Sequence, residues 1–454
     1  MNLKNEEPIV AVVIYAKSQI NTFIKSSALE NLARFHTIKI YTTSNDISQI
    51  CEKLQIVSEQ LPDLNVLVRK YSGLVQMIAL WKFRDRSMNH LVRAMASFGS
   101  KKQRVLWNCV VVSEMKINVL KRWIIRILSV SILFKSVLTI EKILRIVFIY
   151  PKYRKFFVQH KTILIPFSGH VAMEFGALVW ASKKFKINSI ALQENWDNLS
   201  TKTFILDEPN FFGVWGEQSS GHVRSIHRMF KTQVTEIGSA RFNPYYDSSV
   251  VEPVVSDYSG SEQTLKLPYI LIGGTGDGED DLQLINSCYE SIHKLDHSNG
   301  IEIVYRPHPF TRKRIDPLEI KQKYSGILID SGPNSTKFGH VNDLVKNCKL
   351  LVNHFSTLSL EGLITNRLVC VPLFLGRETA KYRYYHILNE WHHMMGIGLI
   401  PNLYTPRSQK DFEKILVKLL NSDSPKLQFD VNWLCKKTNW AEEVSTIIRK
   451  TTTN

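Results

Sequence analysis

Three polar clusters in the second half of the chain each follow a predicted strand, and each contains residues suited to binding a phosphate. The first is GGTGDGEDD (273–281), where Gly274 and Gly276 would let the backbone approach a ligand closely. The helix expected to follow offers N–H groups and a partial positive charge at its N-terminus. The spacing is neither GxGxxG nor a P-loop, and the acidic residues would also suit a helix N-terminus that binds no ligand.

The second cluster, YRPHPF (305–310), contains a permanent cation and an imidazole. Arg306 carries forked N–H donors that suit a phosphate. His308 lies between two prolines, which limit its backbone freedom, and it can donate to a phosphate oxygen or to a nucleoside. The alternative is a solvent-exposed loop without a ligand.

The third cluster, NHFSTLSLEGL (353–363), lies where a predicted strand turns into a helix. Ser356 and Thr357 occupy the cap and first-turn positions, where their hydroxyl and N–H groups either cap the helix or hold a phosphate. Glu361, about one turn later, could accept hydrogen bonds from a ribose diol. A capping motif with no ligand is the alternative here.

In the first half of the chain, LQENWDNLSTK (192–202) also follows a predicted strand. A carboxylate at Asp197 or Glu194 could take a proton from an acceptor hydroxyl while a donor phosphate leaves. Trp196 would offer a flat apolar face to a sugar ring, and Asn198 is a further candidate for sugar or acceptor contact. The alternative is a structural loop in which Asp197 or Asn198 caps a turn.

Two weaker candidates follow the same logic. SGH (168–170) comes after a predicted strand, so His170 is a reserve base, and Arg241 in GSARFNPYY (238–246) either reaches a donor phosphate or serves only a linker. The paired histidines of WHHMM (391–395) would face different directions on a helix, which disfavours a metal site. We therefore predict no metal and no cofactor, and the DGEDD stretch is the one place where a metal could bind.

The elements that must position these residues alternate between strand and helix, which predicts parallel sheets with βαβ crossovers. In the first half the sequence predicts strands at 8–15, 37–43, 64–69, 162–167, 187–193, 211–216 and 234–239, with helices at 19–33, 46–56, 171–184 and 217–230. In the second half it predicts strands at 268–274, 301–306, 326–330, 349–354 and 367–374, with helices at 280–296 and 357–365.

A polar, turn-rich stretch at 243–265 is the best linker in the chain. We therefore predict an α/β protein of two Rossmann-like domains that face each other across a cleft, where ligands of open α/β sheets bind. The first domain covers 1–250 and has a helical, basic insertion at about 75–160. The second covers 260–430, and 431–454 forms a C-terminal helix.

Composition limits the function further. Lysine and arginine outnumber aspartate and glutamate by 58 to 41 in 454 residues, so the net charge of +17 would attract nucleic acid, acidic lipid or phosphorylated small molecules. The sequence has no recognised RNA or DNA motif and no strand pattern of aromatic and basic residues, so we predict no nucleic-acid partner. Its six cysteines form no CxxC pair, as in the reduced core of a cytosolic protein.

The segment 121–150 is the most apolar part of the chain, but basic residues interrupt it too often for a membrane span, at Arg122, Arg126, Lys135, Lys142 and Arg145. It predicts one or two apolar helices with a basic stripe. Such helices could lie on an anionic membrane surface, and the alternative is a helical pair packed on its own domain with a solvated basic face.

Taken together, the Arg-x-His-Pro and Ser-Thr motifs over 268–376 resemble the nucleotide-binding half of GT-B glycosyltransferases, most closely bacterial surface-polysaccharide enzymes that use cytidine-nucleotide donors. In sialyltransferases and β-Kdo transferases of this type, a His-Pro motif and a Ser-Ser/Thr motif hold the CMP part. Teichoic-acid polymerases that use CDP-glycerol have a similar layout.

The loop at 192–202 is similar to the Gln-x-Trp-His-Gly-Thr segment of those CDP-glycerol polymerases, and Asp197 stands where their histidine base would be. The same loop, through QENWDNLS, also resembles a group of predicted surface-carbohydrate transferases. GSARF (238–242) is similar to the Gly-Ser-x-Arg-Phe stretch that ends the first domain of such enzymes.

The resemblance implies an inverting glycosyltransferase that uses a nucleotide-activated sugar, with a CMP-sugar favoured, in the synthesis of surface polysaccharide, capsule or lipopolysaccharide. It would act in the cytoplasm, peripherally at the inner face of the cytoplasmic membrane, on a glycan or lipid-linked acceptor held by the first domain. A CDP-alditol phosphotransferase and a UDP-sugar 2-epimerase are the alternative enzymes. A non-catalytic membrane-associated assembly protein is the alternative of another class.

Overall fold

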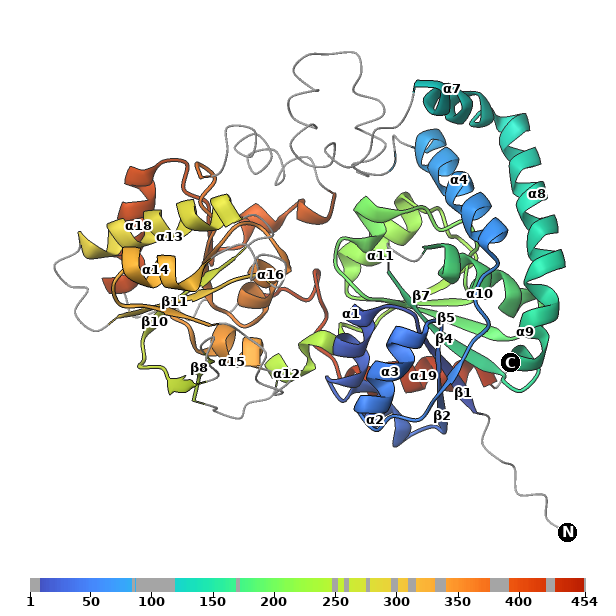
Figure 1. The fold of residues 1–454 in the computed structure, drawn as a ribbon, viewed down its shortest axis with the longest axis horizontal. Helices are drawn as coiled ribbons and strands as arrows, with labels where there is room; N and C mark the ends of the chain where they lie inside the picture. Colours follow the sequence, from blue (N-terminus) through green and yellow to red (C-terminus); the bar gives the residue numbers. More distant parts are fainter. Residues whose placement is uncertain are drawn as a thin grey trace, which may run out of the picture. The chain divides into compact units, whose positions relative to one another are not determined.

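The computed structural model describes residues 9–83, 86, 119–168, 172–246, 252–256, 261–274, 278–294, 301–308, 316–330, 340–375, 392–421 and 429–452. The chain divides into two compact units (Figure 1). Unit 1 comprises Met1–Asn243 together with Asn432–Asn454, and unit 2 comprises Pro244–Val431. Each unit is built on a parallel sheet, which confirms the predicted α/β class and the two Rossmann-like domains.

Unit 1 contains a seven-stranded sheet in the order β3-β2-β1-β4-β5-β6-β7, and every pair in it is parallel. Its central strands are buried on both faces, which explains why they read as continuous apolar runs such as VAVVI and TILIPF. The strands are β1 (Val10–Ile14), β2 (Ile38–Thr42), β3 (Ser58–Gln60), β4 (Thr162–Phe167), β5 (Asn188–Gln193), β6 (Phe211–Val214) and β7 (Gln233–Glu236).

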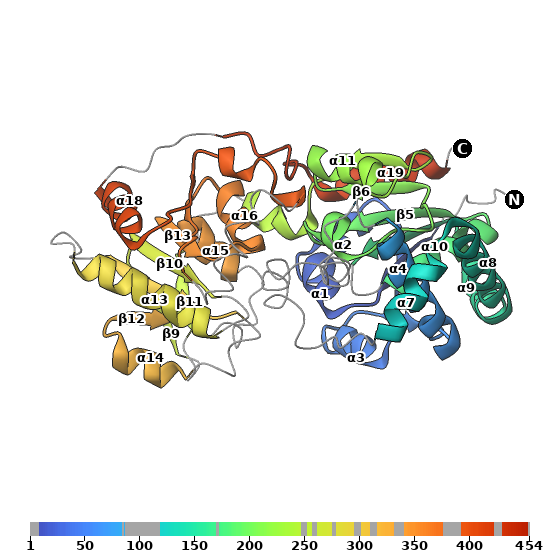
Figure 2. The same ribbon diagram turned by 90° about the horizontal axis from the view of Figure 1, so that it is seen from above.

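Helices cover both faces of this sheet (Figures 1 and 2). One face packs against α4 (Val66–Lys82), α9 (Tyr150–Phe157), α10 (Ala172–Lys184) and α11 (Glu217–Ser225). The other packs against α2 (Ala28–Ala33), α3 (Asn45–Lys53) and α19 (Trp440–Thr452). Burial of apolar side chains on both faces is the main stabilising term for such a layered unit.

The C-terminal segment returns to unit 1. Trp440 of α19 is buried beside Phe23, with ring centroids 5.7 Å apart, and Ile447 lies in the same core. The connection that precedes α19 packs closely on Gly238, which has a φ of +68° and no room for a Cβ beside the carbonyl oxygen of Lys436. Both features favour glycine at this position.

The strand predicted at 64–69 is wrong, because α4 begins at Val66. The side chain of Asn65 caps this helix by accepting the N–H of Leu67 at 2.8 Å. Buried positions at Val68, Val75 and Ile78 then follow a helical period, which a short window of alternating valines had concealed. The third strand of the sheet is instead β3, a short and mostly exposed strand.

Between α4 and β4 the described part of the chain contains the helices α7 (Val119–Leu128), α8 (Ser131–Phe148) and α9. They correspond to the later part of the insertion predicted at about 75–160, whereas 84–85 and 87–118 lie outside the described residues. Ile125, Phe134 and Val137 pack with α4 in an apolar cluster. This packing holds α7 and α8 against unit 1.

A buried charge network fixes α8 to the rest of unit 1. The guanidinium of Arg145, with a side chain 5% exposed, pairs with Glu141 at 2.6 Å and with Asp207 at 2.5 Å. Ser72 of α4 donates to the same Glu141 oxygen at 2.6 Å. The charges are thus paired and hydrogen-bonded, as burial requires.

Unit 2 contains a six-stranded parallel sheet in the order β12-β11-β10-β13-β14-β15. Its strands are β10 (Tyr269–Gly273), β11 (Glu302–Arg306), β12 (Ile327–Ile329), β13 (Leu350–Asn353), β14 (Leu368–Cys370) and β15 (Leu403–Tyr404). A small antiparallel pair precedes it, formed by β8 (Val254–Ser256) and β9 (Glu262–Thr264). Its helices are α13 (Gly278–His293), α14 (Pro317–Lys323), α15 (His340–Asn347), α16 (Thr357–Ile364) and α18 (Gln409–Asn421).

The buried network of α8 yields a stability prediction. Replacing Arg145→Met should lower the free energy of unfolding by about 3 kcal/mol or more, because Glu141 and Asp207 would lose their buried cation. The matched control Lys142→Met, on the exposed side of the same helix, should change it by less than about 0.5 kcal/mol. Urea unfolding of both variants measures this, and equal losses would contradict the structural role of Arg145.

Candidate functional site

The three clusters predicted in unit 2 end at one edge of its sheet. Gly273 of β10 is in register with Arg306 of β11 on one side and with Asn353 of β13 on the other. The N–H of Gly274 also donates to the carbonyl oxygen of Arg306 at 2.8 Å. The strand order reverses between β10 and β13, and ligands of open α/β sheets bind beside the carboxyl ends of strands at such a point.

Gly274 sits where two loops approach each other closely. A Cβ there would lie 2.7 Å from Oδ2 of Asp281 and 2.8 Å from the backbone nitrogen of His308. The loop after β10 and the loop after β11 are therefore in direct backbone proximity, and glycine permits it. His308 itself is half-buried, and Gly276 lies outside the described residues.

Ser356 caps α16, as the alternative interpretation of this motif predicted. Its Oγ accepts hydrogen bonds from the N–H of Leu358 at 3.2 Å and from Nδ2 of Asn353 at 3.1 Å. Ser359 completes the cap by donating to Oδ1 of Asn353 and accepting the N–H of Ser356. Ser356 is exposed, and its hydroxyl has a proton of its own to donate. Thr357 is the first residue of α16.

Arg306 lies beside a buried carboxylate that the sequence interpretation missed. Its Nε is 3.7 Å from Oδ2 of Asp330, a fully buried residue, and Nε2 of His340 is 2.8 Å from Oδ1 of the same carboxylate. Asp330 follows β12 directly and ends the apolar run GILID, a signal that could have identified it. The Arg306 side chain is 15% exposed, and its contact with a phosphate stays a prediction.

Glu361 is buried on the second turn of α16, and its Oε2 accepts the hydroxyl of Tyr245 at 2.5 Å. Tyr245 comes from the segment predicted to be a linker, so no local pattern indicated that these two residues pair. The predicted contact of Glu361 with a ribose diol stays a prediction.

In unit 1, Glu194 follows β5 directly and is fully buried. Its Oε2 accepts a hydrogen bond from Nε2 of Gln19 at 3.3 Å. Burial raises the pKa of the Glu194 carboxyl, while neighbouring hydrogen bonds and the positive charge of Arg241 oppose the rise. Burial also raises the pKa of Tyr15, and the charge of Glu194 adds to that shift. A carboxylate with a raised pKa at the carboxyl end of a parallel strand is a candidate for proton transfer.

The loop that follows Glu194 is held by its own side chains. The indole N–H of Trp196 donates to Gln218 at 3.0 Å, and Nδ2 of Asn198 donates to the carbonyl oxygen of Phe167 at 2.8 Å. Both Trp196 and Asn198 are buried, so they serve the packing of this loop, and their contact with an acceptor stays a prediction.

Asp197 is the more exposed carboxylate of the loop. It is half-buried, and its Oδ2 accepts the hydroxyl of Thr201 at 3.1 Å. Arg241 lies in a short 3-10 helix, Ala240–Phe242, and its charge acts on Glu194 as described above. His170, the reserve base, lies outside the described residues.

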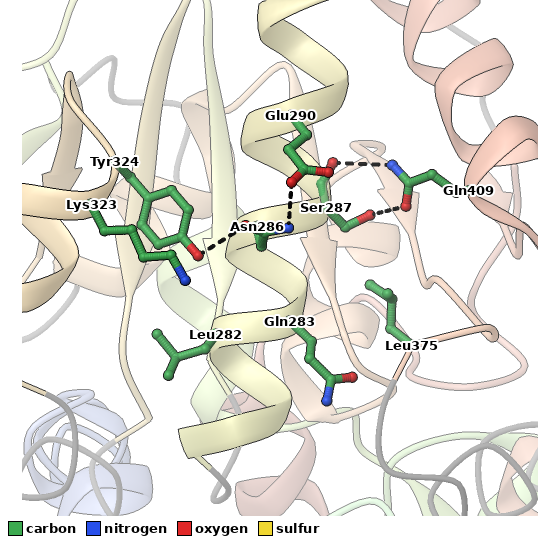
Figure 3. A pocket seen from close by; sticks show the side chains of 9 residues that line it. All are labelled: Leu282, Gln283, Asn286, Ser287, Glu290, Lys323, Tyr324, Leu375 and Gln409. Atoms are coloured by element: carbon green, nitrogen blue, oxygen red, sulfur yellow. Dashed lines mark hydrogen bonds between the residues drawn. The ribbon is translucent and has the colours of Figure 1, made fainter.

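A pocket of about 400 Å³ lies on the flank of α13 in unit 2 (Figure 3). The polar groups around it bond to one another: Nδ2 of Asn286 donates to Glu290 at 2.8 Å, and the hydroxyl of Ser287 donates to Gln409 at 2.6 Å. None of the predicted site residues lines it. Its lining residues are Leu282, Gln283, Asn286, Ser287, Glu290, Lys323, Tyr324, Leu375 and Gln409.

Neither a protein-family model nor a curated protein matches this sequence. Among solved structures, the chain is similar over 98% of its length to all of the UDP-GlcNAc 2-epimerase from Methanocaldococcus jannaschii, with a TM-score of 0.51 and 12% identity. It is also similar over 99% of its length to 97% of a putative UDP-N-acetylglucosamine 2-epimerase from Listeria monocytogenes, with a TM-score of 0.52 and 10% identity.

The glycotransferase of kitacinnamycin is a third such structure, with a TM-score of 0.51, 10% identity and coverage of 98% of this chain and 99% of that one. The chain has the GT-B fold. At these identities the likeness concerns the fold, whereas the site must be argued from its own residues.

His227 supports the Asp197 loop and gives it a pH dependence. Its Nδ1 accepts the N–H of Ile205 at 3.2 Å, so Nε2 carries the proton that is donated to the carbonyl oxygen of Leu199 at 2.8 Å. Burial lowers the pKa of His227 to about 4, from an ordinary value of 6.5. The neutral imidazole is therefore part of the folded state.

The free energy of unfolding depends on pH because His227 has different pKa values in the folded and unfolded chains. The unfolded chain binds a proton at His227 below about pH 6.5 and the folded chain only below about pH 4, so stability should fall by about 3 kcal/mol as the pH drops through this window. Urea unfolding at a series of pH values should show this loss in the wild type and a smaller loss in His227→Gln. An identical pH slope in both proteins would contradict the assignment.

Proposed function

We propose that the protein is an enzyme that acts on a nucleotide-activated sugar, with the nucleotide held by unit 2. The observation that carries this proposal is the meeting of three strand ends, at Gly273, Arg306 and Asn353, where the strand order of unit 2 reverses. The phosphate of a nucleoside monophosphate or diphosphate would suit the hydrogen-bond donors at these strand ends.

Each donor has a separate task in the proposed complex. Gly274 keeps the loops after β10 and β11 in contact beside the phosphate, and the Ser356 hydroxyl and the N–H of Thr357 at the start of α16 donate to its oxygens. Arg306 supplies positive charge, and Arg306 and His308 both supply hydrogen-bond donors, as negative charge develops on the leaving group. Glu361 accepts from the ribose.

The reaction we propose is inverting glycosyl transfer, with a CMP-sugar as the favoured donor and a glycan or lipid-linked acceptor of surface polysaccharide or lipopolysaccharide synthesis. The acceptor oxygen attacks the anomeric carbon, its proton passes to a carboxylate of unit 1, and the bond to the phosphate breaks with the electron pair leaving on the nucleotide. Asp197 is the proposed base because it is more exposed than Glu194, and Thr201 orients its carboxylate.

Nucleotide binding tests the role of unit 2. At a CMP concentration one hundred times its Kd, the folded protein should gain about 2.7 kcal/mol of stability, seen as a rise in melting temperature. Ser356→Ala should weaken this binding about tenfold through loss of a hydrogen bond to a charged group, beyond its own cap cost of about 1 kcal/mol. Ser287→Ala, in the pocket on the flank of α13, is the matched control and should leave the Kd unchanged.

CDP, UDP and GDP complete that panel. A response to UDP alone would overturn the CMP-sugar assignment and keep the nucleotide site. No response to any nucleotide, or an equal loss in both serine variants, would contradict the site itself.

The base can be tested by paired variants. Asp197→Asn should lower the rate of transfer by about a hundredfold to ten-thousandfold without changing the Kd for nucleotide, because it removes proton transfer and leaves unit 2 intact. The control Asp46→Asn, an exposed carboxylate on α3, should leave the rate unchanged. A greater loss in Glu194→Gln than in Asp197→Asn would identify the buried carboxylate as the base instead.

A UDP-sugar 2-epimerase is a second candidate, favoured by the likeness in fold to two structures that carry that name. An epimerase needs no acceptor. Formation of the 2-epimer from UDP-GlcNAc alone, followed by sugar analysis, would favour it and contradict the transferase. A CDP-alditol phosphotransferase would instead transfer glycerol phosphate or ribitol phosphate from its CDP donor.

A further inference from the structure

The outward side of α7 and α8 exposes large apolar side chains along its whole length. We call this surface the α7–α8 outer face and define it by Leu120, Trp123, Ile127, Ile132, Ile143 and Val147. Ile132 is 77% exposed and Trp123 is 58% exposed. Figure 1 shows α7 and α8 at the periphery of unit 1.

These residues lie on the side of the two helices that faces away from the core of unit 1. The opposite side of α8 carries Phe134 and Val137, which pack with α4, and the buried Arg145. An ordinary surface helix pairs one apolar stripe with a polar outward side. Here both sides are apolar, and large contiguous apolar surfaces of this kind mark sites of interaction.

Hydroxyl groups on the outer face are satisfied within α8 itself. Ser136 donates to the carbonyl oxygen of Ile132 at 3.3 Å, and Thr139 donates to that of Lys135 at 2.9 Å. Such bonds to the preceding turn are how serine and threonine are accommodated in apolar surroundings. The α7–α8 outer face can therefore enter apolar surroundings while these two hydroxyl groups keep their hydrogen bonds.

The charges around the face have one sign. In 119–160 the exposed side chains include Lys121, Arg126, Lys135 and Lys142, whereas Glu141, the one acidic residue of this stretch, is buried and paired. Lys135 and Lys142 are seven residues apart and thus lie along one line of α8. A second copy of the same face would bring these cations against like charges, which disfavours a symmetric dimer.

We propose that the α7–α8 outer face lies on an anionic lipid bilayer, with its apolar side chains in the headgroup and acyl boundary and its lysines and arginines against lipid phosphates. Trp123 is of the residue type that favours this boundary. The helices lie in the plane of the surface, because no helix in the described ranges combines the length and apolar character needed to cross a bilayer. This binding does not depend on the reaction proposed above.

Vesicle co-sedimentation of the full chain tests it. The wild type should bind vesicles of phosphatidylcholine with phosphatidylglycerol, release at high salt, and bind phosphatidylcholine alone far more weakly. The double variant Ile143→Ser/Val147→Ser should bind at least tenfold more weakly, because two apolar side chains leave the membrane phase. Lys135→Gln and Lys142→Gln should each weaken binding about fivefold.

The matched controls lie elsewhere on unit 1. Val57→Ser, at a side chain 91% exposed, and Lys53→Gln should bind as the wild type does. Unchanged melting temperatures in all variants would show that they are folded. No binding to anionic vesicles, or equal binding by the outer-face variants and the controls, would overturn the proposal. So would a concentration-dependent dimer, seen by sedimentation, that Ile143→Ser/Val147→Ser abolishes.

Discussion

Parallel pairing of neighbouring strands is the constraint on which the candidate chemistry of this protein depends. A parallel ladder brings the carboxyl ends of its strands to one edge, so residues distant in sequence become neighbours there. In unit 2 the register of β10 with β11 and β13 brings Gly273, Arg306 and Asn353 side by side. In unit 1 the same rule places Tyr15 and Glu194 after β1 and β5, on either side of β4.

Buried charge distinguishes the groups that hold the fold from those that could react. Arg145 and its two carboxylates satisfy one another inside unit 1. In unit 2 the fully buried Asp330 lies beside Arg306 and His340, whose side chains are partly exposed. Glu194 differs, because burial raises the pKa of its carboxyl despite its hydrogen bonds. A raised pKa at the end of a strand makes Glu194 the alternative to Asp197 as the group that takes the proton.

The sequence predicted the parts of the fold whose causes are local. Apolar runs fully buried in parallel sheets identified β4, β5, β10 and β13, and Ser356 was recognisable as a cap from its place before a helix. Contacts between residues distant in sequence could not be predicted, because no local pattern indicates that Tyr245 bonds Glu361 or that α19 returns to unit 1. The strand predicted at 64–69 was wrong because the alternating valines fit both the strand period and the helix period.

The chemistry proposed for this protein requires that the strand ends of unit 2 form a nucleotide site. A crystal structure of the protein grown with CMP or a CMP-sugar tests it most directly, because density for the phosphate locates the site without reference to activity. We expect that phosphate to lie beside Gly274, with Ser356 and His308 within hydrogen-bonding distance of it. A nucleotide seated instead against Gln283 and Gln409 on the flank of α13 would contradict it.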